Sequence, residues 1–348
     1  MRKYLISDTL NSYKANLHTH STCSDGGLTP AEIKEHYKAN GYSVLCITDH
    51  DVFIPHNDLT DDDFLMLNGY ELEVNQPAKE VSPITKNGKT CHMCMVATEP
   101  DMETPVCWHR EKYIPAKALP SKDLVKFDPD VPDYVRVYSC EGVSDMMRLG
   151  RENGFFVTYN HPTWSCEDYT NYIGYENMHA MEIANYTCLC GGYPEHNERV
   201  YDDMLRAGKR IYCTATDDGH GKGSMCGCYI MVQADKLEYR TVINAIMNGE
   251  FYSSEAPVIK NLYIEDGKVT IETSDAAEIR FTTGIRKSKR FLCKEGETLT
   301  EATYELPVDK DPYYFRVTVT DKNGKFAYTN AYFCDELTEY LAQPAVEQ

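Results

Sequence analysis

The residues best suited to chemistry are histidines and carboxylates that stand at the ends of short apolar segments. His18 and His20 close the segment "ANLHTH", and Asp25 follows in the glycine-containing loop "SDGG". Side chains alternate along a strand, so two residues separated by one position point to the same side. We therefore expect His18 and His20 to face one common space, with Asp25 turned back toward them by the loop.

Later apolar segments carry the same kinds of residue. These segments read "YSVLCITDHD", "FLMLNGYELEV", "KTCHMCMVAT", "GFFVTYNHP", "AMEIANY" and "RIYCTATDDGH". Their ligand-type residues include His50, Glu71, His92, His161, Asp218 and His220. In a parallel α/β barrel the strand ends lie on one rim, where active sites are built. The sequence therefore predicts that these side chains meet in one cavity.

Imidazole and carboxylate ligands together favour Zn²⁺, Mn²⁺ or Fe²⁺ over calcium alone. One tetrahedral ion needs four ligands, and the set is larger than that. We expect two or three divalent ions (Mn, Fe or Zn) that share bridging carboxylates. A single histidine or aspartate at a strand end is more often a cap or a solvated loop residue, so the prediction depends on the whole set. The predicted metal ligands are His18, His20, Asp25, His50, Glu71, His92, His161, Asp218 and His220.

Composition limits the possible classes of function. The 348 residues are 42% hydrophobic, enough for a folded core, and the formal charge is −19. Nucleic-acid binders usually have a basic face, so non-specific DNA or RNA binding is disfavoured. A charged small substrate can still bind where metal ions reverse the local field. The sequence shows no apolar leader and no run of about 18 apolar residues, so we expect a cytoplasmic protein without a membrane span.

The fourteen cysteines do not form a recognisable zinc or disulfide pattern. Most stand singly among apolar residues, as Cys46, Cys213 and Cys334 do, which is typical of buried thiols in a reducing compartment. The "CHMC" at 91–94 resembles half of a zinc knuckle, but strong zinc motifs have a second matching pair. We interpret these two cysteines as buried neighbours of His92.

The elements that must position the ligands are expected in residues 1–255. There, apolar segments alternate with helical patterns, which is typical of repeated βα units. Helices are predicted over 29–41, 144–154, 195–210 and 236–250, the first with Thr29 and Glu32 as a capping box. An insertion at about 95–135 interrupts the alternation. Insertions of this length are usually functional lids or mobile loops, and the sequence does not choose between them.

Residues 256–348 have a different pattern. Short alternating segments such as "KVTIET" and "EIRFTTG" predict strands, and the "NG" at 323–324 indicates a hairpin. We expect a small antiparallel β-sandwich here. This region contains no histidine.

The ordered motifs resemble those of the PHP (polymerase and histidinol phosphatase) superfamily over residues 14–255. They are "NLHTHSTCSDG", "ITDHD", "GYELE", "CHMCMVA", "NHP", "EIANY" and "TATDDGHG". The resemblance implies a distorted (β/α)₇ TIM-like barrel with a di- or trinuclear metal centre, and phosphoester hydrolysis as the commonest activity. The region after residue 255 resembles, more weakly, the β-domain of some bacterial two-domain members.

The resemblance also divides the ligands among three ions. His18, His20 and Asp218 would hold the first; Glu71, His92 and His161 the second, with Glu71 as the bridge; and Asp25, His50 and His220 the third. Some members have histidine at the Asp25 position, so a labile third ion is expected here. Glu73 and Asp217 compete with their neighbours; the G-x-E context favours Glu71, and the D-x-H spacing favours Asp218.

The expected function is hydrolysis of small phosphomonoesters or nucleotides by a hydroxide that bridges two ions. His18, His20, Glu71 and Asp218 would act catalytically through that hydroxide. Two alternatives remain open: hydrolysis of carboxylic esters, carbamates or amides on the same centre, and a non-catalytic metal-binding regulator or scaffold.

Other polar residues are assigned supporting roles. Arg148 is predicted, with Arg110, as a phosphate clamp. Glu182 is expected to support a ligand histidine, and Asn185 to orient a ligand or the substrate. His56 and His109 are expected at the surface.

Overall fold

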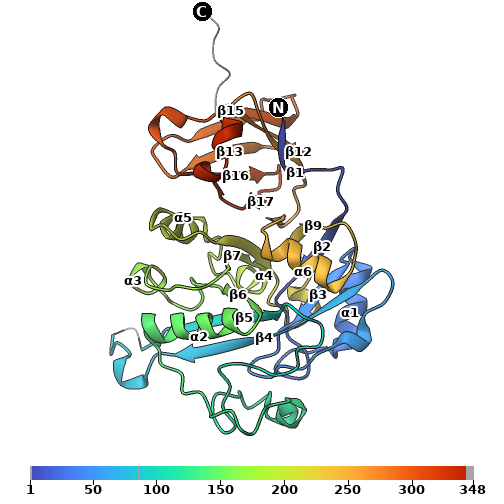
Figure 1. The fold of residues 1–348 in the computed structure, drawn as a ribbon, viewed down its shortest axis with the longest axis vertical. Coiled ribbons are helices and arrows are strands. Elements are labelled where there is room, and N and C mark those ends of the chain that lie inside the picture. Colours follow the sequence, from blue (N-terminus) through green and yellow to red (C-terminus); the bar gives the residue numbers. More distant parts are fainter. Residues whose placement is uncertain (1, 85, 342–348) are drawn as a thin grey trace, which may run out of the picture.

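The computed structural model describes residues 2–84 and 86–341, which form a mixed α/β region with an antiparallel β region stacked on one end (Figure 1). The central strands are β2 (Ser12–Asn16), β3 (Val44–Ile47), β4 (Leu65–Asn75), β5 (Thr90–Ala97), β6 (Phe155–Tyr159), β7 (Ala180–Asn185), β8 (Tyr212–Thr216) and β9 (Tyr229–Gln233). They pair in the order β9-β2-β3-β4-β5-β6-β7-β8 within a 14-stranded sheet. The predicted α/β class is confirmed.

Strand direction differs from the expectation of a uniformly parallel sheet. The pairs β2–β3, β3–β4, β6–β7 and β7–β8 are parallel, but β5 is antiparallel to both neighbours. Among the strands of the described residues, β8 pairs only with β7, so strand pairing does not close a barrel. An isolated parallel bridge between Thr19 and Gly219 nevertheless brings the segments after β2 and β8 together.

The helices pack against these strands through apolar faces. They are α1 (Pro30–Ala39), α2 (Cys140–Glu152), α3 (Tyr169–Tyr172), α4 (Tyr186–Cys190), α5 (Glu198–Arg206) and α6 (Tyr239–Met247). The predicted capping box of α1 is present, with Thr29 and Glu32 binding each other's backbone groups. α2 contributes Met146 and Met147 to the same buried cluster as Met93 and Val157 of β5 and β6. Burial of these faces holds the strand ends in place.

The segment between β5 and α2 is folded onto the rest of the molecule, beyond β4 and β5 in the lower part of Figure 1. Its only regular element in the described residues is a short 3₁₀ helix at Leu119–Leu124. The side chains of Trp108, His109 and Arg136 are buried. The segment is therefore an integral part of the structure and not a solvated loop.

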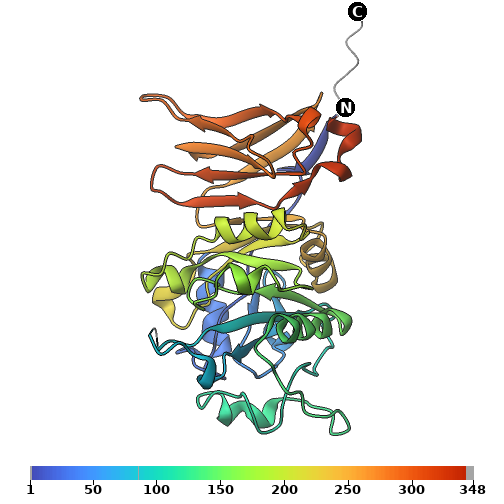
Figure 2. The ribbon, with the colours of Figure 1, turned by 90° about the vertical axis from the view of Figure 1, so that its left-hand side faces the viewer.

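The second region is an antiparallel β-sandwich, seen edge-on in Figure 2. Its smaller sheet has the order β1-β11-β12-β15, from β1 (Lys3–Ile6), β11 (Ile259–Glu265), β12 (Lys268–Ala276) and β15 (Leu299–Glu305). The facing strands belong to the large sheet: β10 (Phe251–Ser254), β13 (Glu278–Thr283), β14 (Lys289–Leu292), β16 (Tyr314–Thr320), β17 (Phe326–Thr329) and β18 (Tyr332–Phe333), and α7 (Thr338–Leu341) follows them. Leu262 and Ile271 of the small sheet share one buried core with Phe281 and Val317 of the large one.

Two connections join the regions. β10 pairs with β9 on one side and β17 on the other, so one sheet continues through residue 255. β1 pairs with β11, so the first strand lies in the small sheet although its residues precede β2. The "NG" hairpin joins β16 to β17, with Gly324 in a left-handed conformation at φ +76°. Its turn spans five residues, because Asp321 donates to the carbonyl of Lys325.

All cysteines fall in the described residues and are unpaired, with Cys46, Cys213 and Cys334 buried as expected. Within the described ranges, every helix is too short or too polar to cross a bilayer.

Candidate metal centre

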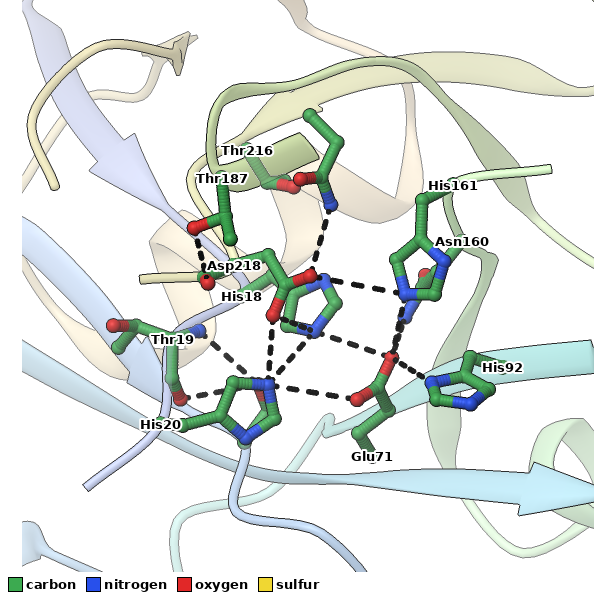
Figure 3. A network of polar contacts seen from close by, with 12 residues as sticks. His18, Thr19, His20, Glu71, His92, Asn160, His161, Thr187, Thr216 and Asp218 are labelled. Atoms are coloured by element: carbon green, nitrogen blue, oxygen red, sulfur yellow. Dashed lines mark hydrogen bonds and ion pairs between the residues drawn. The ribbon is translucent and has the colours of Figure 1, made fainter. Parts of the chain in front are cut away.

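Glu71 lies at the centre of the predicted ligand set (Figure 3). Its Oε1 is 3.2 Å from His18 Nε2, 3.3 Å from His92 Nδ1 and 3.3 Å from His161 Nε2. Its Oε2 is 3.1 Å from His50 Nδ1. One fully buried carboxylate thus touches histidines from four segments of the chain, as a bridging ligand would.

Asp218 lies beside His18 and His20. Its Oδ1 is 3.3 Å from His18 Nε2 and 2.9 Å from His20 Nε2. His20 stacks on His50 and His220, with ring centroids 4.3 Å away in each case. All nine predicted ligands therefore converge, as the side chains labelled in Figure 3 illustrate for the inner part of the set.

Four groups of these side chains bring donor atoms within 4.8 Å of one another. They are His18–His20–Asp218, His18–Glu71–His161, His50–Glu71–His92 and His20–Asp25–His50–His220. The first group matches the expected ligand set of one ion, and the last matches another with His20 added. The expected joint site of Glu71, His92 and His161 is not among the four groups, although both histidines lie 3.3 Å from Glu71 Oε1.

The unpaired donor atoms fit cations. Buried atoms without a hydrogen-bond partner include His20 Nδ1, Asp25 Oδ1, His50 Nδ1, Glu71 Oε2 and His92 Nδ1. The Nε2 atoms of His18 and His20 face each other at 3.2 Å. Buried polar atoms normally find partners, and an ion between such atoms would satisfy them.

Buried polar residues fix the orientation of the ligands. Glu182 accepts from His18 Nδ1 at 2.6 Å, which leaves His18 Nε2 as the atom that faces the centre. It also accepts from the backbone N–H of His161 at 2.9 Å. Asn185 donates to Glu182 at 3.0 Å and to Asp218 at 3.3 Å. The supporting roles expected for Glu182 and Asn185 agree with these contacts.

Asp49 supports the loop that carries Asp25. Its carboxylate accepts from the backbone N–H of Ser21 at 2.7 Å and from the hydroxyl of Ser24 at 2.5 Å. Asp49 directly precedes His50. Its hydrogen bonds to Ser21 and Ser24 therefore fix the loop of Asp25 relative to His50.

Three non-glycine residues next to or in the ligand set have left-handed backbone conformations. They are Asp51 at φ +58°, His161 at φ +26° and Asp218 at φ +52°, each just after a strand. Such conformations cost free energy for residues with a Cβ and concentrate at functional sites. Here they turn the chain abruptly so that ligands at strand ends face inward.

The centre favours positive charge. Burial alone would raise the pKa of Glu71, but His18, His92 and His50 outweigh it and hold that pKa well below its usual range. Burial opposes protonation of His161, yet Glu71 and Asp218 raise its pKa to about 9. Proton binding and cation binding therefore compete at the same nitrogen atoms.

Arg136, from the segment before α2, binds chain segments on the outer side of the candidate centre. It is buried and forms an ion pair with Asp51, the residue after His50. It also donates to the carbonyl of Glu73 at 2.7 Å and to the carbonyl of Cys107 at 3.2 Å. One guanidinium thus ties together the chain segments that present His50 and Glu71. Arg136 was not predicted, because nothing in the local sequence links position 136 to position 51.

The two carboxylate alternatives differ in their surroundings. Asp217 points away and accepts from the backbone N–H groups of Cys226, Gly227 and Cys228 and from the Tyr37 hydroxyl. Glu73 lines the cavity, but its Oε2 lies 3.5 Å from His92 Nε2 and it belongs to none of the four groups. The geometry therefore favours Asp218 and Glu71.

Arg148 and Arg110 do not reach the centre. Arg148 lies on the exposed side of α2, where it pairs with Asp145 and Glu152. Arg110 donates to the carbonyls of Pro129 and Val131 within its own loop. The phosphate-clamp assignment is wrong for both positions in this conformation, because their guanidinium groups are engaged elsewhere. The expectation of a surface position is also wrong for His109, which is buried.

The ligands open into a cavity of about 420 Å³. Its lining includes seven of the nine predicted ligands, together with Glu73, Pro115, Trp164, Thr187, Cys188 and Tyr193. Trp164 and Tyr193 were not predicted; they follow predicted strands, but an isolated aromatic residue in a loop carries no functional signal. A cavity of about 550 Å³ between residues 101–108 and α2 contains none of the ligands and is not the candidate centre.

No protein-family model matches the chain, and no curated protein matches it. Solved structures similar to it include PHP-like metal-dependent phosphoesterases. A two-domain protein from Bacteroides vulgatus ATCC 8482, containing a predicted PHP-like metal-dependent phosphoesterase, is 15% identical, with 94% of this chain and 97% of that chain covered and a TM-score of 0.43. A proposed metal-dependent phosphoesterase from Bifidobacterium adolescentis is 17% identical, with coverages of 61% and 89% and a TM-score of 0.37. An amidohydrolase from Chromobacterium violaceum is 16% identical, with coverages of 68% and 96% and a TM-score of 0.39. Likeness at this level does not decide between activities.

Proposed function

We propose that this protein is a metal-dependent phosphoesterase of the PHP type that hydrolyses small phosphomonoesters or nucleotides. The observation that carries the proposal is the overlap of the four ligand groups, which share His18, His20, His50 and Glu71. Overlapping groups suit two or three neighbouring divalent cations (Mn, Fe or Zn). Neighbouring cations match the several oxygens of a phosphoryl group that is being displaced. Residues 1–255, apart from β1, would form the catalytic domain, a distorted (β/α)₇ barrel, and 256–348 would form the β-domain together with β1.

Bound cations would neutralise phosphoryl oxygens and lower the pKa of water. The residues of this chain then have distinct tasks. Glu182 holds the Nδ1 proton of His18, so that Nε2 faces the centre. Asn160 donates to Glu71 Oε1 at 2.8 Å and fixes the central carboxylate. Asn185 fixes Asp218, and Asp49 fixes the loop of Asp25.

The charge of the cavity makes the cations essential to the proposal. Asp25, Glu71, Glu73 and Asp218 line it, while no described lysine or arginine does. An anionic substrate would be repelled by this surface without bound cations. The same acidic balance, with the formal charge of −19, disfavours long polynucleotides as partners and leaves a small phosphorylated substrate.

Metal analysis combined with two assays tests the proposal. We expect two or three equivalents of metal in the purified protein and phosphate release from p-nitrophenyl phosphate. Asp218→Asn and His161→Gln should lose both, whereas His36→Gln, on the outer side of α1, should retain both. Bound metal with hydrolysis of p-nitrophenyl acetate alone would indicate a carboxylic ester hydrolase. Bound metal with neither activity would favour the non-catalytic alternative, and no metal after reconstitution would contradict the centre itself.

A further inference from the structure

Two large aromatic side chains stand at the mouth of the cavity. Trp164 is 39% exposed and Tyr193 is 45% exposed, and both line the same cavity as the ligands. The Trp164 ring lies 5.0 Å from the His161 ring and 5.4 Å from the His92 ring, between centroids. Two exposed aromatic rings at one cavity, beside the candidate ligands, provide an apolar surface on which a ligand can bind.

The loops that carry these aromatic residues are held by one buried carboxylate. Glu195 accepts from the backbone N–H of Thr163 at 3.0 Å and of Trp164 at 2.7 Å. Its own backbone N–H donates to the carbonyl of Tyr193 at 2.9 Å. Asn197 donates to Glu195 at 2.8 Å. The two aromatic positions are therefore fixed relative to each other before a substrate arrives, which lowers the entropic cost of stacking.

Apart from the predicted ligands, Glu73 is the charged residue of the cavity lining in the part of the chain that the structure describes. Glu73 is partly exposed there, and its carboxylate accepts from Asn75 but has no described lysine or arginine partner in the cavity. A second phosphate or carboxylate on the substrate would face this charge without compensation. A neutral or cationic group on the substrate would not be repelled by the Glu73 carboxylate.

We propose that the leaving group of the substrate is a planar ring without a second anionic group, which stacks on Trp164 and Tyr193 while its phosphoryl group enters the metal centre. Aromatic nucleosides and aryl alcohols belong to this class; sugar bisphosphates and nucleoside diphosphates do not. The inference rests on the proposed function for the placement of the phosphoryl group. Stacking uses the faces of both rings, so it selects planarity and tolerates different ring types.

Phosphonates test the inference separately from turnover, because their C–P bond is not hydrolysed. In the metal-loaded protein, we expect phenylphosphonate to bind about tenfold more tightly than methylphosphonate, measured by calorimetry and by quenching of tryptophan fluorescence. Trp164→Ala should abolish that preference, and Tyr193→Ala should reduce it. Tyr169→Ala is the matched control, because Tyr169 is exposed at the start of α3 and does not line the cavity.

A second pair of probes tests the charge rule. We expect 4-carboxyphenylphosphonate to bind about tenfold more weakly than phenylphosphonate, and Glu73→Gln to narrow that difference. Equal binding of phenyl- and methylphosphonate, or an unchanged preference in Trp164→Ala, would overturn the inference. Tight, Trp164-dependent phenylphosphonate binding without hydrolysis of any phosphomonoester would instead sustain it and reject the proposed function.

Discussion

Two buried clusters of charged residues in this protein differ in how their charges are compensated. The candidate metal centre holds nine ligand-type side chains, and several of their buried atoms have no hydrogen-bond partner. The Arg316 cluster, which consists of Arg316, Asp202, Glu198, Tyr314 and Thr318, joins α5 to β16. Arg316 is only 2% exposed, and its guanidinium binds both oxygens of Asp202, at 2.9 and 3.0 Å, and Glu198 at 3.2 Å.

The difference separates structural from functional use of buried charge. In the Arg316 cluster, each charged group meets an opposite charge from the protein. Tyr314 also donates to Asp202 Oδ1 and Thr318 to Glu198 Oε1, two oxygens that Arg316 binds as well. At the candidate metal centre, the carboxylates face histidine nitrogens and no lysine or arginine in the described lining of the cavity. Bound cations would compensate their negative charge. A buried polar cluster with open donor atoms is thus a better indicator of chemistry than burial of charge alone.

The largest expected effect comes from removing the central carboxylate. Glu71→Gln keeps the shape but loses the charge shared by the ligand groups, so we expect loss of bound metal and a decrease in kcat/KM of about 1000-fold. Elemental analysis and phosphate release measure the two effects. Glu301→Gln, on exposed β15, is the control. If Glu71→Gln retains metal and activity, the metal centre lies elsewhere. The two clusters would then not differ in function as described above.

The converse change is made in the Arg316 cluster. Arg316→Met leaves Asp202 buried without its partner, so we expect the free energy of unfolding to decrease by about 3–5 kcal/mol. Metal content per folded molecule should not change. Urea unfolding followed by circular dichroism measures the loss, with Arg290→Met on the exposed side of β14 as the control. A loss of metal at full stability would show that this cluster is functional as well.

Arg136 lies between the two cases, because it is a structural ion pair that touches the metal centre. Arg136→Lys removes the fork that binds Asp51 and the carbonyl of Glu73, so we expect a 10–100-fold decrease in metal affinity at the His50 side of the centre. Competition with a chelator measures this, and Arg110→Lys, in the same segment, is the control. A change in stability without a change in affinity would restrict Arg136 to a structural role.

The smallest expected effect is a pH dependence of stability that arises away from both clusters. His179 is half-buried against Phe156 and accepts the backbone N–H of Val157 at 3.0 Å. Burial, and then the charge of Arg151, lower its pKa to about 4. The unfolded state binds a proton near pH 6.5 and the folded state does not, so this residue decreases stability as the pH falls from about 6.5 to 4.

The expected size is about 1–2 kcal/mol, below the full linkage value because His179 is partly exposed. His179→Asn keeps an acceptor for the backbone N–H of Val157 but cannot bind a proton in this range. The free energy of unfolding of this variant should therefore depend less on pH between about 6.5 and 4. The measurement is urea unfolding between pH 4 and 8 with a chelator present for both proteins. Parallel curves would show that the metal-centre histidines alone determine the acid sensitivity.

The convergence of the candidate ligands could be predicted because strand-end position is a local property of the sequence. His18 and His20 lie just beyond the end of β2, and Asp218 and His220 just beyond the end of β8, so strand-end position was the part of the signal that held. Glu71 was expected at a strand end but lies within β4, which continues to Asn75. The direction of β5 could not be predicted, because apolar periodicity is the same in both directions. His92 reaches the centre because β5 runs backward and presents its beginning at that end of the sheet.

The contacts made by the segment before α2 could not be predicted for a different reason. Arg136 and Asp51 are far apart in the chain, and their ion pair depends on how an irregular segment folds over β4. The pairing of β1 with β11 is likewise a long-range contact. The sandwich itself was predictable from its alternating strands and its "NG" turn, since these are short-range signals.

The pairing of β1 also has a consequence for the order of events during synthesis. β1 precedes the central strands in the chain, and its partner β11 follows them. Residues 3–6 therefore cannot take their place in the small sheet until β11 has been synthesised. The sandwich is thus completed only after the chain segments of the central strands have been made.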